Sequence, residues 1–190
     1  MNASLLTGSQ TVGPFFSPSL LREGASRNVL TESATPGERI RIEGRVLDGD
    51  GAPVPDAMVE IWQADAEGHY NHPADPQPDI DFTGYGRSGT GEDGSYWFET
   101  IKPGSVPFDA QHMQAPHVVV TIFSRGLLNH LVTRLYFADE PANDSDPVLG
   151  YVPDERRPTL MARRETKGTI AIYRFDIIMQ GTGETVFFNL

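Results

Sequence analysis

Cysteine is absent from this 190-residue chain, which excludes disulfide bonds, thiolate metal ligands and thiol nucleophiles together. Basic residues are few, with 15 Lys and Arg against 26 Asp and Glu, and the formal net charge is -11. An acidic surface repels phosphate backbones and anionic lipids, so we expect neither nucleic acid nor a membrane as partner. No run of transmembrane length and no secretory leader is present, which predicts a cytoplasmic protein.

Long segments of helical periodicity are also missing, and short stretches of alternating apolar residues take their place. The pattern, with Gly- and Asp-rich turns between the stretches, predicts an all-β fold, namely an antiparallel β-sandwich or barrel. The one helix we expect is short and covers 157–164. The polar segment 64–94 is too long for a passive connection, which favours a functional role. The predicted strands are 39–47, 57–62, 95–101, 117–124, 131–137, 169–179 and 185–188.

Residues 1–38 are rich in Gly, Pro, Ser and Thr, with a few apolar pairs such as Phe15-Phe16. This composition predicts an extended N-terminal arm ahead of a single domain at 39–190. The segment 9–16 sets a Gly-Pro step beside aromatic anchors, as a segment that docks into a groove would. A poorly ordered terminus is the alternative.

His117 lies where a proline-rich loop meets the apolar run 118–120. It can be read as a metal ligand, a catalytic base or a hydrogen-bonded core residue. A metal site on this strand needs a second donor two residues on, since side chains at i and i+2 share a face. That position is Val119, so the strand supplies at most one ligand.

Arg134 lies within a strand, where alternation places it on one face with Val132 and Tyr136. A guanidinium among apolar neighbours needs an anionic partner. An internal carboxylate and the carboxylate of a bound substrate both remain open from the strand alone. Phosphate-binding loops, nucleophile elbows and HExxH helices are absent, so nucleotide and nucleophilic chemistries have no support.

Six motifs and the C-terminal stretch occur together in an order that is similar to intradiol ring-cleavage dioxygenases. Within that family the chain resembles the non-iron subunits of members that cleave 3,4-dihydroxybenzoate. The resemblance covers nearly the whole chain. The matching segments are SQTVGPFF (9–16), GRVLD (44–48), IWQAD (61–65), TIKPG (100–104), PH (116–117), TRLYF (133–137) and the ending 174–188.

The resemblance implies a β-sandwich enzyme that uses O2 and a non-haem Fe(III) held by two tyrosines and two histidines. The ligand positions fall on Tyr70, Val106, His117 and Val119, so two of four donors are aliphatic. A family arginine before the histidine pair is replaced by Gln114. Affinity depends on ligand number and type, so we expect no iron in this chain.

The same resemblance implies that a homologous beta chain holds the Fe(III) and that the two chains form a hetero-oligomer. Thr11, Gly13 and Pro14 of the arm would line the partner's substrate pocket, and Arg134 would face the substrate carboxylate.

Two alternatives stay open at this point. One is a prealbumin-like or carboxypeptidase-regulatory-like β-sandwich that acts as a non-catalytic binding module. The other is a homo-oligomer with a different metal held by His69, Tyr70 and His72.

Overall fold

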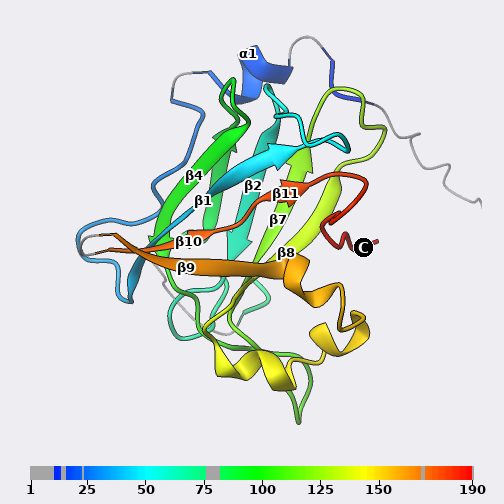
Figure 1. Ribbon diagram of the computed structural model, residues 1–190. Coiled ribbons are helices and arrows are strands. Elements are labelled where there is room, and N and C mark those ends of the chain that lie inside the picture. The colour runs from blue at the N-terminus through cyan, green and yellow to red at the C-terminus, as the bar shows by residue number, and fades with distance from the viewer. Residues whose placement is uncertain (1–10, 14–15, 23, 76–81, 168–169, 190) are drawn as a thin grey trace, which may run out of the picture.

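The computed structural model describes residues 11–13, 16–22, 24–75, 82–167 and 170–189. Its elements follow one another along the chain as coloured in Figure 1. They are α1 (Phe16–Leu20), β1 (Arg39–Leu47), β2 (Met58–Gln63), β3 (Tyr85–Gly89), β4 (Ser95–Ile101), β5 (Val106–Pro107), β6 (Met113–Gln114), β7 (His117–Phe123), β8 (Leu131–Phe137), β9 (Met161–Lys167), β10 (Ile170–Arg174) and β11 (Ile177–Ile178), with 3-10 helices η1 (Pro141–Ser145), η2 (Leu149–Tyr151) and η3 (Arg157–Leu160) between β8 and β9.

Nine strands form one large sheet in the order β11-β1-β10-β9-β8-β7-β2-β3, with β4 paired to β1, while β5 and β6 form a separate small hairpin. The predicted all-β class is confirmed. The prediction that the strands are antiparallel is wrong for three pairs, since β1 is parallel to β10 and β11, and β8 is parallel to β9. These strands are joined by long connections, and no local sequence pattern sets their direction.

Strands from along the whole length of the large sheet contribute side chains to a hydrophobic core, and the sheet curves around this core toward a barrel. Alternation along each strand explains this, because every second side chain points inward. The strands β1, β2, β4, β7, β8 and β10 all contribute, with Ile40, Ile42, Val59, Ile61, Phe98, Val118, Val120, Leu135, Phe137 and Tyr173 among the buried members. The side chains on the other face of β2, β7 and β8 point away from this core.

The C-terminal third departs most from the sequence-based expectations. The helix predicted at 157–164 is wrong, because only residues 157–160 form a 3-10 turn and β9 begins at Met161. The predicted strand 169–179 is divided into β10 and β11, and 185–188 forms no strand. Strand β9 is rich in charged residues, so its pairing with β10 and β8 overrides a local pattern that does not indicate a strand.

Strand β3 lies within the segment that the sequence assigned to a polar loop. Gly86 interrupts the alternating pattern that would indicate a strand, and close packing explains why a glycine is found at this position. A Cβ there would meet the side chains of Leu30, Ile61 and Phe98 at 2.8 to 3.0 Å. Close approach of the arm to the sheet therefore requires glycine.

The described part of the arm runs along its own sheet before β1 begins, as the blue segment of Figure 1 shows. Asn28 donates hydrogen bonds to Ser88 Oγ and to the Trp97 carbonyl, and Leu30 N donates to the Glu99 carbonyl. These contacts fix residues 27–30 on the sheet. No helix among the described residues has the length and apolar character needed to span a membrane.

Candidate functional site

The outward face of β2, β7 and β8 brings together several of the residues that the sequence singles out. The register places Trp62 beside Val119 and Val119 beside Arg134 in one row across the three strands. His117 pairs with Tyr136 in the next row, with ring centroids 5.7 Å apart. Because the intervening residues point into the core, this whole face is presented to the loops that cover it.

Arg134 carries the positive charge of this face and is partly buried. Its Nη1 donates to Gln114 Oε1 at 2.7 Å and to the Tyr136 hydroxyl at 3.3 Å. Both acceptors are neutral, and within the described part of the chain Arg134 forms no ion pair with a carboxylate. The sequence left open whether Arg134 pairs with a carboxylate of this chain or with the carboxylate of a substrate. The described residues give no support to the first alternative. The hydrogen bond to Tyr136 also agrees with the shared face predicted from alternation.

Asp146, at the end of η1, organises the loops beneath this face. Its Oδ1 accepts hydrogen bonds from Val148 N and Leu149 N, and its Oδ2 accepts one from Ala115 N at 2.7 Å. The Tyr136 hydroxyl donates to the same carboxylate at 3.3 Å. Backbone amides thus satisfy a buried charge, and they hold the segment that leads into His117. Sequence reasoning missed Asp146, which no motif marks.

Tyr70 stacks on Trp62, with ring centroids 5.9 Å apart and planes 12° from parallel. Burial raises the pKa of Tyr70, and the nearby charge of Arg134 acts in the opposite direction. The two rings line a cavity of about 370 Å³ together with His72, Ala74 and Asp75. An aromatic wall beside a cationic group is a surface suited to an aromatic anion.

His117 is buried, with 3% of its surface exposed, and its Nδ1 donates to the Ala115 carbonyl at 2.8 Å. Because a carbonyl only accepts, Nδ1 carries the hydrogen and Nε2 is left as the acceptor of the neutral ring. Burial, aided by the charge of Arg134, lowers the pKa of His117 to about 4. The ring is therefore neutral near pH 7.

The hairpin of β5 and β6 closes one side of the face. Val106 is 4% exposed and pairs with Gln114 across this hairpin. Gln114 also donates from Nε2 to the Pro107 carbonyl at 3.1 Å. The aliphatic side chain of Val106 and the amide of Gln114 thus lie where the family resemblance places an iron ligand and an arginine.

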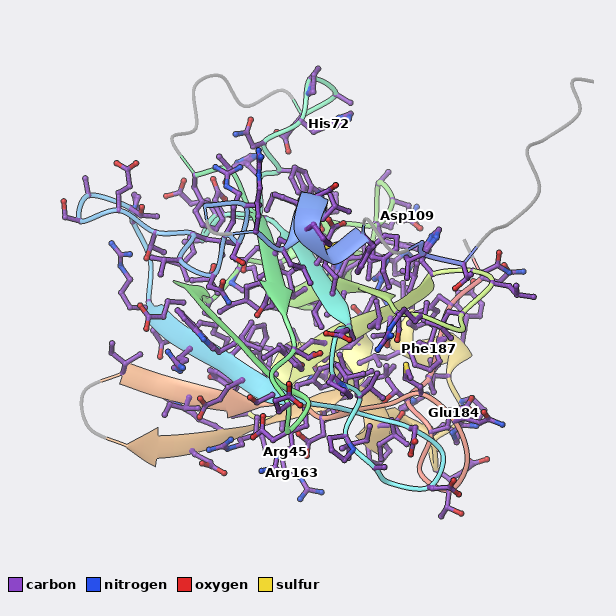
Figure 2. The ribbon with its side chains drawn as sticks, turned by 90° about the horizontal axis from the view of Figure 1, so that it is seen from above. Arg45, His72, Asp109, Arg163, Glu184 and Phe187 are labelled. Carbon is purple, nitrogen blue, oxygen red and sulfur yellow. The ribbon has the colours of Figure 1, made fainter. Side chains whose placement is uncertain are left out.

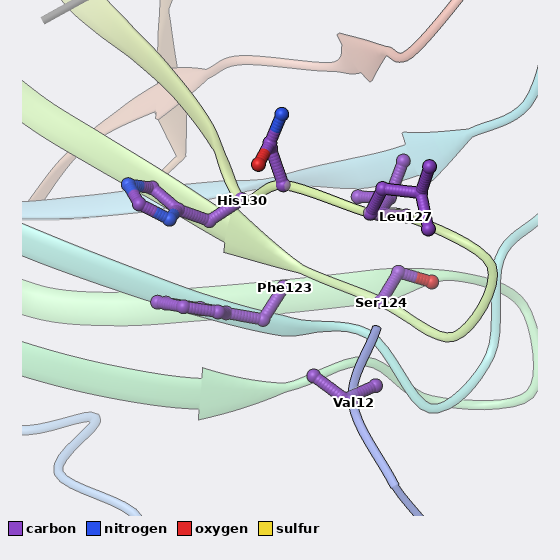
Figure 3. A pocket seen from close by; sticks show the side chains of 7 residues that line it. Val12, Phe123, Ser124, Leu127 and His130 are labelled. Carbon is purple, nitrogen blue, oxygen red and sulfur yellow. The ribbon is translucent and has the colours of Figure 1, made fainter. Parts of the chain in front are cut away.

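The arm residues form a second, separate group at the β7–β8 turn. Gly126 N donates to Thr11 Oγ1 at 3.0 Å, and Gly13 O accepts from Phe16 N. Figure 3 shows Val12 of the arm beside Ser124, close to Phe123, at a pocket of about 200 Å³. The predicted site residue Pro14 lies outside the described residues. The structure therefore brings Arg134 together with the ligand positions and keeps the arm residues apart from them.

The alternative metal site at His69, Tyr70 and His72 finds no support among the described residues. The Nδ1 atom of His69 lies 3.2 Å from Asp75 Oδ1, and Figure 2 shows His72 on a loop at one edge of the molecule. Where the chain is described, no cluster of three or more histidine, aspartate or glutamate side chains could hold a metal ion.

The donor set of the outward face does not suit Fe(III). Tyr70 and His117 are the two donors at the four ligand positions, and Val106 and Val119 have none. A guanidinium at Arg134, the pairing neighbour of Val119, adds a positive charge beside the position that a cation would occupy.

Comparison with known proteins decides the family. The family model described as "Dioxygenase" matches residues 12–181. The chain belongs to the intradiol dioxygenases. It is 45% identical over 195 residues to the protocatechuate 3,4-dioxygenase alpha chain of Burkholderia cepacia, covering 97% of both chains. It is 35% identical to the beta chain of the same enzyme from that organism, covering 94% of this chain and 77% of the relative.

A solved dioxygenase domain from Streptomyces sp. SirexAA-E has a similar fold, with a TM-score of 0.66 and 29% identity over 92% of this chain and 98% of that domain. The greater identity to alpha than to beta chains identifies this protein as an alpha-type subunit of an intradiol dioxygenase. The family is one of iron-dependent oxidoreductases. The resemblance drawn from the sequence motifs is thereby confirmed.

Proposed function

We propose that this dioxygenase subunit works with a homologous beta chain to cleave 3,4-dihydroxybenzoate with O2 to 3-carboxy-cis,cis-muconate. Both oxygen atoms enter the product, and the ring bond between the two hydroxylated carbons breaks. Fe(III) in the beta chain supplies the oxygen chemistry, and this chain binds no iron. The assembly is a cytoplasmic αβ hetero-oligomer. In this proposal residues 39–190 form a β-sandwich of the prealbumin-like kind, and residues 1–38 are an arm that packs on the partner.

The observation that carries the proposal is that Arg134 has only neutral hydrogen-bond acceptors among the described residues. A guanidinium whose hydrogen-bond acceptors are both neutral keeps its full attraction for an incoming carboxylate. The ring of a dihydroxybenzoate offers such a carboxylate opposite its two hydroxyl groups. Arg134 thus orients the substrate with its hydroxyls directed away from this residue and toward the partner's metal.

The arm provides the second contribution in this proposal. Thr11 lies at the β7–β8 turn, where its hydroxyl accepts a hydrogen bond from Gly126 N, and Gly13 and Pro14 follow it in the sequence. In this proposal a neighbouring subunit that docks at this turn contacts these three residues. The match to the family model begins within this region, at residue 12. The arm would line the partner's pocket and exclude water from it.

The test uses the complex with the iron-bearing chain, in which Arg134 is replaced by Ala. We expect the KM for 3,4-dihydroxybenzoate to rise by tenfold or more, while kcat on plain catechol changes little, because catechol has no carboxylate. Arg163→Ala is the matched control, since Arg163 is exposed on β9, and Figure 2 shows it at the edge of the molecule opposite His72. Equal losses on both substrates would contradict the carboxylate role.

Co-expression with a candidate beta chain tests the wider proposal. A stable complex with ring-cleaving activity is the expected result. A chain that stays monomeric beside such a partner and binds no aromatic carboxylate would instead favour the non-catalytic binding module.

A further inference from the structure

Arg134 is held in position by Gln114, and no described carboxylate forms an ion pair with it. The distance from Arg134 Nη1 to Gln114 Oε1 is 2.7 Å, which is shorter than the 3.3 Å from the same nitrogen to the Tyr136 hydroxyl. An amide oxygen accepts such a bond without carrying a formal charge. The arginine therefore gains orientation from Gln114 and loses none of its net charge to it.

The amide of Gln114 is itself fixed in one orientation. Its Nε2 donates to the Pro107 carbonyl at 3.1 Å, across the β5–β6 hairpin. Rotating the amide by half a turn would place NH2 against the Arg134 donors and an oxygen against the Pro107 carbonyl, with two repulsive contacts in place of two hydrogen bonds. The oxygen of Gln114 must therefore face Arg134.

The second acceptor of Arg134 is arranged in the same way. The Tyr136 hydroxyl donates its hydrogen to Asp146 at 3.3 Å, so its lone pairs remain for Arg134. The carboxylate of Asp146 is occupied by the backbone amides of Ala115, Val148 and Leu149. The negative charge of Asp146 is thus held by backbone amides instead of by the guanidinium.

We propose that Gln114 is a positioning residue that determines specificity for carboxylated substrates, because it orients Arg134 and leaves its charge available. This inference rests on the proposed role of Arg134 at the substrate carboxylate. A Glu at position 114 would differ by one atom and would pair with the arginine as an internal anion. With an amide at position 114, Arg134 remains available to the substrate carboxylate. With a carboxylate at position 114, Arg134 would be paired inside the chain and would attract the substrate carboxylate less.

The experiment compares Gln114→Glu, Gln114→Leu and Arg134→Gln in the complex with the iron-bearing chain. Steady-state kinetics are measured on 3,4-dihydroxybenzoate and on catechol. The dissociation constant is measured for 4-hydroxybenzoate, which has the carboxylate but lacks the second hydroxyl and is not cleaved. Thermal unfolding of each complex shows that it is assembled.

We expect Gln114→Glu to raise both the KM for 3,4-dihydroxybenzoate and the dissociation constant for 4-hydroxybenzoate by about tenfold or more, with kcat on catechol within about twofold. Gln114→Leu removes the acceptor of Arg134 without adding a charge. It should raise the same KM and the same dissociation constant by about threefold. This variant carries the test if the glutamate variant does not assemble.

The outcomes separate this inference from the proposed function. If Arg134→Gln weakens binding of 4-hydroxybenzoate and neither change at Gln114 does, the role of Gln114 is wrong and that of Arg134 stands. If Arg134→Gln leaves binding unchanged, the carboxylate role of Arg134 is wrong, and the inference fails with it. Equal losses on catechol and 3,4-dihydroxybenzoate in the Gln114 variants would show a general structural effect and would also overturn the inference.

Discussion

Val119 on β7 is the direct pairing neighbour of Arg134 on β8. At one of the four ligand positions of the family, this chain thus has an aliphatic side chain without a donor atom and, next to it, a positive charge. Each feature alone weakens a metal site, and together they disfavour a cation at this position. The face keeps its aromatic wall of Trp62 and Tyr70.

The purified chain should therefore take up little iron. After incubation with iron and desalting, we expect well below one iron per chain and no visible band from tyrosinate bound to Fe(III), because Tyr70 and His117 are the two donors left. Metal analysis and an absorption spectrum provide the measurement, with the co-expressed complex as positive control. Stoichiometric iron with a visible band would contradict the assignment.

Acidification should destabilise the fold through His117. The unfolded chain takes up a proton at this residue near pH 6.5, whereas burial delays uptake in the folded chain to about pH 4. Between these values the unfolded state binds more protons, so the free energy of unfolding falls as the pH decreases. The loss from this one group between pH 7 and pH 4 is about 3 kcal/mol.

Denaturant unfolding at several pH values checks this, with His117→Gln as the comparison. The Gln side chain does not titrate, so the difference in stability between the two proteins should change with pH across this window. Parallel pH profiles for the two proteins would contradict the assignment of the acid sensitivity to His117.

Replacement of Gly44 should cost much of the protein's stability. A Cβ at this position would overlap the backbone carbonyl of Phe175, where β1 runs beside the segment between β10 and β11. We expect Gly44→Ala to lower the free energy of unfolding by about 3 kcal/mol. Gly150→Ala is the matched control, since a Cβ at Gly150 would meet no other atom within 4 Å. If Gly44→Ala lowered the free energy of unfolding as little as Gly150→Ala does, the prediction would be wrong, and β1 would be able to move away from Phe175.

Removal of residues 1–13 should separate folding from activity. The hydrogen bonds of Thr11 with Gly126 and of Gly13 with Phe16 are lost, but the contacts of Asn28 and Leu30 with the sheet stay in place. The midpoint of thermal unfolding of the isolated chain should therefore change by no more than about 2 °C. In the complex we expect kcat/KM for 3,4-dihydroxybenzoate to fall by about tenfold or more. Full activity of the shortened complex would exclude the arm from the pocket.

Alternation made the strands around the core predictable. Ile40, Ile42 and Val46 on β1, and Val118 and Val120 on β7, follow the period of two, and the structure buries all five. The same period placed Arg134 on the face of Tyr136. These features depend on local sequence alone, which is why sequence reasoning could reach them.

Other parts of the fold and site depend on contacts between distant residues, and their sequences hold no local signal. Strand β9 is charged and forms because two neighbours offer it hydrogen bonds. Asp146 looks like a loop aspartate, yet three backbone amides converge on it. The contact of Gln114 with Arg134 joins residues on different hairpins. The motif resemblance identified both positions but not their hydrogen bond.

The parallel pairing of β1 with β10 has a consequence for how the chain folds. Residues 40–43 find their partners at 171–174, so the ribosome must release almost the whole chain before the first strand is fully paired. Such distant pairing slows folding, because a long loop has to close before the contacts that stabilise it can form. Until then one edge of β1 is unpaired, and an open strand edge of this kind is a site at which chains can associate.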